Sequence, residues 1–345
     1  MQQQITPNSA VRLAVAGCGH WGKNLVRNFD SLGALHGLCD VDANRLASLG
    51  QAYPTARRYS RYEELLADPE LQAVVIATPA EHHMKMAIAA LEADKDVFVE
   101  KPLALTAADG RQMTEAARRT GRLLMVGHLL LYHPAVRAIQ RIVDSGELGR
   151  LEYIYSNRLS MGKIRQEENA LWSFAPHDVS VILMLTGGAM PVQATATGGA
   201  YLQPNIADVT LSTLLFDRGA RAHIFVSWLH PYKEQRLVVI GSRRMLVFED
   251  SRATDKLLVY DKEITWKDGA FEAAQPKATP VAIEADEPLR AECAHFIECV
   301  ATRRPPMTPG EDGVRVLEIL EACQRSLQMN GEPVQVATAS RILTL

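Results

Sequence analysis

The sequence predicts an α/β protein with two domains: an N-terminal doubly wound parallel sheet, and a C-terminal α+β domain with a large open, mostly antiparallel sheet. Residues 11–29 (VRLAVAGCGHWGKNLVRNF) read as a strand, a glycine-rich turn and a helix, the opening of a Rossmann domain. Strand and helix patterns alternate through the first third of the chain, as in a parallel sheet. After about Gly127, apolar and polar residues alternate in many runs, as in a sheet with one solvated face.

The first domain, residues 1–127, is expected to contain strands made of short apolar, β-rich runs, each followed by a helical pattern. A run of this kind without alternation is typical of a parallel strand buried on both faces. The expected strands are Arg12–Ala16, Leu35–Cys39, Leu71–Thr78, Asp96–Val99 and Leu123–Val126, and the expected helices are Lys23–Leu32, Glu63–Leu66, Met84–Ala93 and Ala107–Arg119.

The second domain, residues 128–345, is expected to bind the substrate and to mediate oligomerisation. Residues 261–288 are polar and rich in Ala, Glu, Lys and Pro, which predicts a long loop or an edge region. The expected strands are Leu151–Leu159, Pro191–Thr197, Ala207–Phe216, Ala220–Trp228, Leu237–Gly241, Met245–Glu249 and Lys256–Tyr260, and the expected helices are Pro134–Asp144, Ser180–Leu185, Leu289–Thr302 and Gly313–Met329.

Composition excludes several classes of function. The formal net charge of the 345 residues is −3, so no basic field favours nucleic acid or an anionic membrane. No apolar run approaches a membrane span, and residues 1–10 lack a secretory pattern, so we expect a frayed tail and a cytoplasmic protein. The five cysteines form no C-x-x-C pair, which predicts reduced, mostly buried thiols and no metal site.

The glycine turn predicts a dinucleotide site, with NAD as the cofactor. Gly17 permits the tight turn, Gly19 admits a pyrophosphate, and Gly22 allows close packing of helix and strand. Asp40 ends the second strand, near the offset at which such folds hold the ribose hydroxyls, and its charge favours NAD over NADP. The alternative is a plain turn with a helix-capping aspartate. NADP remains an alternative cofactor, because arginines at positions 45, 57 and 58 could meet its extra phosphate. The cofactor residues expected here are Gly17, Gly19, His20, Trp21, Gly22 and Asp40.

A lysine follows the carboxyl end of a predicted parallel strand, where open α/β sheets place their ligands. The stretch is Glu100-Lys101-Pro102. Lys101 either polarises a substrate hydroxyl or is a surface lysine in a turn, and spacing alone does not separate these readings.

Several motifs, in order and spacing, resemble the Gfo/Idh/MocA family of sugar and polyol oxidoreductases over roughly Val11 to Leu327. They are the glycine turn, ATPAEHH at 77–83, EKP at 100–102, SGELG at 145–149 and a C-terminal block, PLRAECAHFIECV at 288–300 followed by glycines from Gly310. The family's reaction, NAD(P)-dependent hydride transfer at a secondary alcohol carbon, is what the resemblance implies here.

The resemblance also implies roles for individual residues. Lys101 matches the lysine of the EKP motif, and His177 matches a catalytic histidine on a helix of the second domain. Ser173 stands where the family usually has an aspartate, so the usual aspartate–histidine pair is broken, and Asp178 or another neighbour is left to orient the imidazole. A neutral imidazole suits proton removal from an alcohol, and a lysine cation lowers that alcohol's pKa. The resemblance adds Thr78, Pro79, His83, Glu100 and Lys101 to the cofactor residues.

The segment YSNRLSMGKIRQEENALWSFAPHD (155–178) resembles the branch that oxidises UDP-N-acetylglucosamine or UDP-N-acetylglucosaminuronate at C3, for polysaccharide or lipid A sugars. Basic groups beside aromatics and amides suit a diphosphate and a base, although ion pairs to Glu167 and Glu168 explain them equally well. The substrate-binding residues expected on this basis are Arg158, Lys163, Arg165, Asn169, Trp172 and Asp178.

Two other functions remain open from the sequence. One is a dehydrogenase or ketoreductase of a free sugar, an inositol or a deoxy-sugar nucleotide. The other is a non-catalytic NAD-binding sensor, which Ser173 keeps open. The only expected partners are a small-molecule nucleotide sugar and further copies of the chain, as a homodimer or homotetramer.

Overall fold

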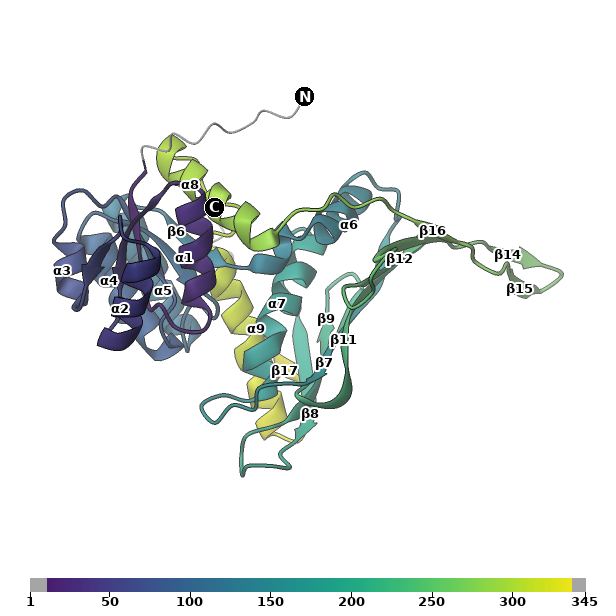
Figure 1. Cartoon of the computed structure of the whole chain (residues 1–345). Helices are drawn as coiled ribbons and strands as arrows, with labels where there is room; N and C mark the ends of the chain where they lie inside the picture. The colour runs from purple at the N-terminus through teal and green to yellow at the C-terminus, as the bar shows by residue number, and fades with distance from the viewer. Residues whose placement is uncertain (1–10, 337–345) are drawn as a thin grey trace, which may run out of the picture. The chain divides into compact units, whose positions relative to one another are not determined.

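The computed structural model describes residues 11–336 (Figure 1). The tail expected at residues 1–10 lies outside this range. The chain forms two compact units, the first made of the residues up to Tyr132 together with Asp286–Leu317. The second contains His133–Ala285 and the chain from Glu318 onward. A C-terminal segment thus returns to the unit that holds the glycine turn.

The first unit is built on a six-stranded parallel sheet in the order β3-β2-β1-β4-β5-β6. The order reverses direction at β1, which is the doubly wound arrangement. Its central strands are buried along their whole length, because helices cover them. The strands are β1 (Leu13–Ala16), β2 (Leu35–Cys39), β3 (Arg57–Tyr59), β4 (Ala73–Ile76), β5 (Asp96–Glu100) and β6 (Leu124–Gly127).

Helices connect these strands and complete the core of the first unit. Helix α1 buries Leu25, Val26 and Phe29. The Phe29 ring lies 6.5 Å from that of Phe296, which anchors the returning helix α8 beside α1. The helices are α1 (Gly22–Ser31), α2 (Ala43–Ala52), α3 (Tyr62–Leu66), η1 (Ala80–His82), α4 (His83–Glu92), α5 (Ala107–Thr120), η2 (Leu129–Tyr132) and α8 (Pro288–Thr302).

The second unit carries a nine-stranded sheet in the order β16-β13-β12-β11-β7-β10-β9-β8-β17. Only the β7–β10 pair is parallel, so the predicted large, mostly antiparallel sheet is confirmed. The strands are β7 (Leu151–Met161), β8 (Gln193–Gly199), β9 (Val209–Leu215), β10 (Arg221–Ser227), β11 (Leu229–Gly241), β12 (Arg244–Glu249), β13 (Leu257–Asp261), β16 (Ala278–Pro280) and β17 (Val334–Gln335).

Three helices complete the description: α6 (Pro134–Asp144), α7 (Ala170–Leu185) and α9 (Gly310–Gln328). The prediction that the helix before β8 begins at Ser180 was wrong. It begins at Ala170, with Asn169 as a side-chain cap, and runs through Pro176. Proline usually ends a helix because it removes one amide donor. Here the helix is buried along most of its length, and packing against the sheet outweighs the lost bond.

Residues 261–288 contain more structure than a loop. Strand β16 pairs with β13 at the sheet edge, as the edge prediction allowed. Between them β14 (Ile264–Lys267) and β15 (Ala270–Ala273) form a separate exposed hairpin, in which the rings of Trp266 and Phe271 meet at 4.7 Å.

All five cysteines are buried, as predicted, and none forms a disulfide. Between residues 11 and 336, no helix combines the length and the apolar character needed to cross a lipid bilayer.

Candidate cofactor and catalytic site

The glycine turn joins β1 to α1 with a geometry that side chains would disturb at two of its three glycines. Gly17 has a φ of +88°, and a Cβ there would lie 2.7 Å from the backbone of Ala77. A Cβ on Gly22 would lie 1.9 Å from the carbonyl oxygen of Gly17. Around Gly19 the space is open to 4 Å, and no side chain caps the first amides of α1. Open space beside uncapped helix amides suits a phosphate.

Asp40, directly after β2, holds a buried carboxylate beside this turn. It accepts hydrogen bonds from the amides of Cys18 (2.8 Å) and Asp42 (2.9 Å) and from the Arg45 guanidinium. Burial acts to raise the pKa of Asp40, but these hydrogen bonds outweigh it and lower the pKa. The residue is therefore an anion at neutral pH, as the predicted contact with ribose hydroxyls requires.

Two of the three arginines that the sequence left open for a 2′-phosphate have acidic partners. Arg45 pairs with Asp40 and also with Asp42, at 3.3 Å. Arg57 pairs with Asp68 and Glu70. Engaged in this way, Arg45 and Arg57 leave less positive charge for NADP than the sequence suggested.

Glu100, at the end of β5, connects the glycine turn to the candidate catalytic lysine. Trp21 Nε1 donates to its Oε1 at 2.5 Å, and the Lys101 amide donates to its Oε2 at 3.2 Å. Burial raises the pKa of Glu100 to about 7. Trp21 is thus held at its indole nitrogen while 38% of the residue remains exposed at the start of α1. The Lys101–Pro102 peptide bond is cis.

His83, one of the predicted cofactor residues, is only 1% exposed. Its Nδ1 lies 2.8 Å from the carbonyl oxygen of Pro102, and its Nε2 lies 2.9 Å from that of Thr78. The ring therefore lies between the EKP turn and the loop after β4. Pro79 and His20 are exposed and Thr78 is half-buried.

Two buried titratable groups of the first unit stand outside the set of predicted site residues. His128, after β6, is 1% exposed, and neither of its ring nitrogens has a hydrogen-bond partner among the described residues. Burial, assisted by Lys101, lowers its pKa to about 4. Glu292 is fully buried on α8. The sequence does carry a signal for Glu292: it is an acidic residue within the apolar stripe formed by Leu289, Cys293 and Phe296.

In the second unit, His177 lies on α7, one turn after Ser173. Ser173 is buried, and its Oγ accepts a hydrogen bond from Arg165 Nε at 3.0 Å. The family's usual carboxylate is therefore replaced here by a hydroxyl that faces a cation.

Asp178 and Arg158 are bonded to each other, in contrast to the prediction that both meet substrate. The Asp178 carboxylate accepts from Ser156 Oγ (2.6 Å) and from Arg158 Nε and Nη2 (3.1 Å each). Both side chains are buried, at 2% and 14% exposure. The pair joins β7 to α7, the helix that carries His177.

Of the other predicted substrate residues, three bond within the protein and one is exposed. Asn169 caps α7, and both Asn169 and Trp172 donate to Gln324 Oε1 on α9, at 2.8 and 3.1 Å. Lys163 and Arg165 lie on the connection between β7 and α7. Lys163 is exposed, whereas Arg165 pairs with Glu168 at 3.0 Å and with Glu167 at 3.8 Å. Lys163 is the most accessible cation of the predicted set.

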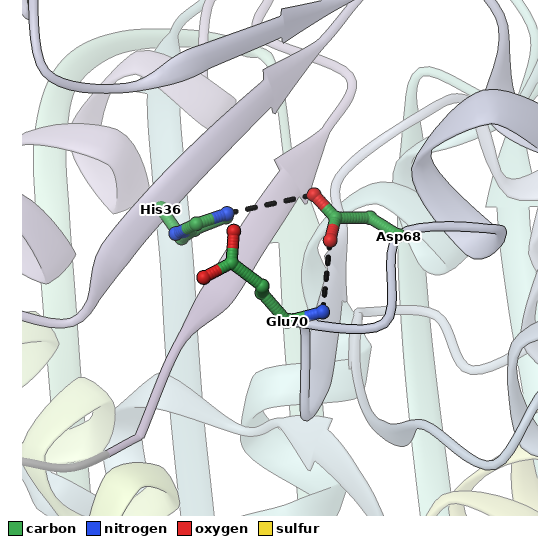
Figure 2. A group of neighbouring side chains, drawn as sticks. All are labelled: His36, Asp68 and Glu70. Atoms are coloured by element: carbon green, nitrogen blue, oxygen red, sulfur yellow. Dashed lines mark hydrogen bonds and ion pairs between the residues drawn. The ribbon is translucent and has the colours of Figure 1, made fainter.

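One group in the described part of the chain has the composition of a metal site: His36, Asp68 and Glu70 (Figure 2). Arg57 and Tyr59 already bond to Asp68, at 2.7 and 2.5 Å, and arginines also pair with Glu70. The two carboxylates of this group are therefore already compensated by cations and a hydroxyl.

Comparisons with known proteins agree with this architecture. A family model described as an oxidoreductase family with an NAD-binding Rossmann fold matches residues 11–128, and the GFO/IDH/MocA C-terminal domain model matches residues 136–247. A putative oxidoreductase from Magnetospirillum magnetotacticum is 32% identical, with a TM-score of 0.77 over 91% of this chain and 99% of its own.

Named relatives differ in substrate. The UDP-N-acetylglucosamine 3-dehydrogenase of Acidithiobacillus ferrooxidans is 27% identical over 89% of this chain and 94% of its own, and its solved structure superposes with a TM-score of 0.81. The scyllo-inositol 2-dehydrogenase of Bacillus subtilis is 28% identical over 94% of this chain and 96% of its own.

The fold and the glycine turn define an oxidoreductase with an NAD-binding Rossmann domain. The chain belongs to the Gfo/Idh/MocA family.

Proposed function

We propose that this protein is an NAD-dependent dehydrogenase that oxidises the C3 hydroxyl of a UDP-N-acetylhexosamine to a ketone. The observation that carries the proposal is the similarity to UDP-N-acetylglucosamine 3-dehydrogenase over nearly the whole of both chains. The exposed Lys163, on the connection that leads to α7, supplies a cation for a diphosphate.

NAD, when bound, supplies the hydride acceptor. The turn at Gly17 and Gly19 and the first amides of α1 would hold its pyrophosphate, and Asp40 would accept hydrogen bonds from its ribose hydroxyls. The pairing of Arg45 with Asp40 supports NAD over NADP, because this guanidinium is already neutralised.

Two residues are proposed to act on the substrate. Oxidation breaks the C–H bond, with hydride leaving the carbon, and breaks the O–H bond, with the proton passing to a base. His177 is the proposed base, and the Lys101 ammonium is proposed to stabilise the developing alkoxide. The Arg158–Asp178 pair joins α7 to β7, and Glu100 accepts from the backbone amide of Lys101, so the backbone that carries each acting group is anchored.

A second candidate is oxidation of a neutral sugar or an inositol. It is favoured by the burial of Arg158 against Asp178 and by the pairing of Arg165 with glutamates, since a neutral polyol needs no diphosphate site. The similarity to scyllo-inositol 2-dehydrogenase points the same way.

The test is a substrate panel. Protein and NAD⁺ are incubated with UDP-N-acetylglucosamine, its uronate, other UDP-sugars, inositols and free sugars, and NADH formation is followed. Faster turnover of any neutral polyol than of every UDP-sugar would replace the first proposal with the second. Tight NADH binding without turnover of any compound would point instead to a sensor. A Lys163→Ala variant should raise the KM of a UDP-sugar and leave that of a polyol unchanged.

We further propose that copies of the chain associate through the face of the large sheet that α7 does not cover. Leu211 and Tyr153 on this face are 48% and 42% exposed, whereas the alternate residues of the same strands are buried. An apolar sheet face of this kind is typical of an oligomer interface. Light scattering after size exclusion tests it: Leu211→Glu should yield monomers, and a monomeric wild-type protein would refute it.

A further inference from the structure

A buried carboxyl group on α8 has no role in the function described so far. Glu292 is 0% exposed, and neither of its carboxyl oxygens has a hydrogen-bond partner among the described residues. An ionised carboxylate in such a place would lack any compensating donor, which is costly. Burial, reinforced by Glu100, raises the pKa of Glu292 well above its ordinary value, so the group is a neutral acid that is able to donate a hydrogen bond.

Glu100 is the neighbouring carboxyl group. The rings of Phe98 and Phe296 lie 5.6 Å apart, which joins β5 to α8. Glu100 is two residues after Phe98 and so projects from the same face of β5, and Glu292 is one helical turn before Phe296 on the buried face of α8. The two carboxyl groups therefore occupy the same layer, between strand and helix.

The position of Glu100 is closely defined by its other neighbours. Its two oxygens accept from Trp21 Nε1 and from the Lys101 amide, both groups that only donate. A Cβ on Gly127 would lie 3.1 Å from Oε2, so this glycine makes room for the carboxyl group over β6. Each oxygen retains a lone pair for one more donor.

We propose that Glu292 is a positioning residue for the cofactor site. Its neutral carboxylic acid donates a hydrogen bond to Glu100, and the pair holds one proton between them. Glu100 thereby keeps its acceptor oxygens toward Trp21 on the glycine turn and toward Lys101, so that one buried pair sets the positions of both.

Other titratable groups around the pair are accounted for. On α8 the Cys293 thiol is buried, and burial together with Glu292 and Glu100 raises its pKa, so it stays neutral. Arg27 is ion-paired with Glu287 before α8. Beyond Glu100 lie Lys101 and the neutral His128. Trp21 carries no titratable proton. The shared proton is therefore confined to the two glutamates.

The first experiment reads the protonation of Glu292 directly by infrared difference spectroscopy of the whole protein at pH 7.5. Subtracting the Glu292→Gln spectrum from the wild-type spectrum should reveal the carbonyl stretch of a protonated carboxylic acid, and Glu298→Gln, at an exposed glutamate of the same helix, should not. A difference spectrum with only carboxylate bands for Glu292 would overturn the proposal.

The second experiment measures NADH affinity by energy transfer from tryptophan. The Glu292→Gln variant retains a neutral hydrogen-bond donor at this position, so it should bind NADH within about twofold of wild type, whereas Glu292→Leu should bind about tenfold more weakly. Equal weakening in both variants would refute the proposal, because packing alone would then explain the residue. The infrared result decides the question if the leucine variant does not fold.

The third readout is the pH profile of NADH affinity. Affinity of the wild type should fall as pH falls through the range in which Glu100 gains its proton. The midpoint should move to higher pH in Glu292→Gln, because the amide is a weaker donor to the Glu100 carboxylate than the carboxylic acid is. A profile that is flat, or unmoved by the substitution, contradicts the shared proton. None of these measurements uses a sugar, so their failure is distinguishable from failure of the substrate assignment.

Discussion

Arg45 Nη1 lies 2.9 Å from each carboxylate oxygen of Asp40. The same carboxylate accepts the amide hydrogen of Cys18, inside the glycine turn. The acid expected to meet ribose is therefore fixed from two sides, by a cation on α2 and by the turn itself. This arrangement also neutralises the Arg45 guanidinium.

Asp40→Ser should shift the coenzyme preference. Removing the carboxylate costs NAD a hydrogen-bond acceptor and releases the Arg45 guanidinium for a phosphate. We expect the variant to bind NADH about tenfold more weakly than the wild type, which corresponds to the free energy of one hydrogen bond to a charged group. It should bind NADPH at least as tightly as the wild type does. Fluorescence titration with both coenzymes measures this. Asp30→Ser, on the exposed side of α1, is the control, and an unchanged ratio in Asp40→Ser would contradict the ribose contact.

The glycines of the turn should separate stability from binding. Gly17→Ala forces a side chain to a φ of +88° and against the backbone of Ala77, so we expect a loss of about 1–3 kcal/mol of unfolding free energy. Gly19→Ala meets nothing within 4 Å in the protein, so stability should change little, while NADH affinity should fall because the methyl group enters the space of the phosphate. Urea unfolding and NADH titration test the pair. The reverse pattern would show that the cofactor does not approach Gly19.

The proposed catalytic groups should affect turnover more than coenzyme binding. Lys101→Met and His177→Asn should each lower kcat about 10²- to 10⁴-fold, the usual contribution of acid–base groups. NADH affinity should remain within about threefold of the wild-type value, a difference in binding free energy smaller than that of one hydrogen bond. Lys85→Met and His82→Asn, at exposed positions, are matched controls. Full turnover in both site variants would defeat the assignment.

His128 should make the protein sensitive to acid. Burial lowers its pKa from 6.5 to about 4, so the folded state binds this proton less readily than the unfolded state. The stabilising effect is complete above about pH 6.5 and is lost as pH falls toward 4. At 1.36 kcal/mol per pKa unit, this corresponds to roughly 3 kcal/mol.

Urea unfolding of the wild type and of His128→Leu between pH 4 and 7.5 measures this effect. The wild type should lose stability relative to the variant as pH falls, and His82→Leu, at an exposed histidine, should follow the wild type. A constant difference between wild type and His128→Leu across this range would show that His128 titrates normally in the folded protein.

Much of the fold was predictable because it depends on local pattern. Buried parallel strands and amphipathic helices carry their signal within a few residues, as for β4 and α1. The start of α7 was missed because Pro176 is a strong local signal against helix, and it is overridden by packing of the helix on the sheet. The α2 helix and the β3 strand were not predicted, since α2 buries Leu46 alone and β3 is three residues long.

The candidate site was also predictable only where it depends on local sequence. The three glycines, Asp40 and the EKP lysine follow from short motifs, because a turn of this kind requires particular residues at fixed spacing. The partners of Arg158 and Asp178 did not follow, because they are on separate elements and meet only after α7 packs on β7.

The amino-acid sequence alone determined the class of fold, the dinucleotide turn and the family, since each is encoded in patterns spanning a few neighbouring residues. Only the tertiary structure decided that Arg45 neutralises Asp40, that the His83 ring lies between two carbonyl groups, and that Glu100 and Glu292 occupy one layer. Charge pairing and burial depend on distance in space, and residues 192 positions apart in the chain (292 − 100) become neighbours only when α8 packs on β5.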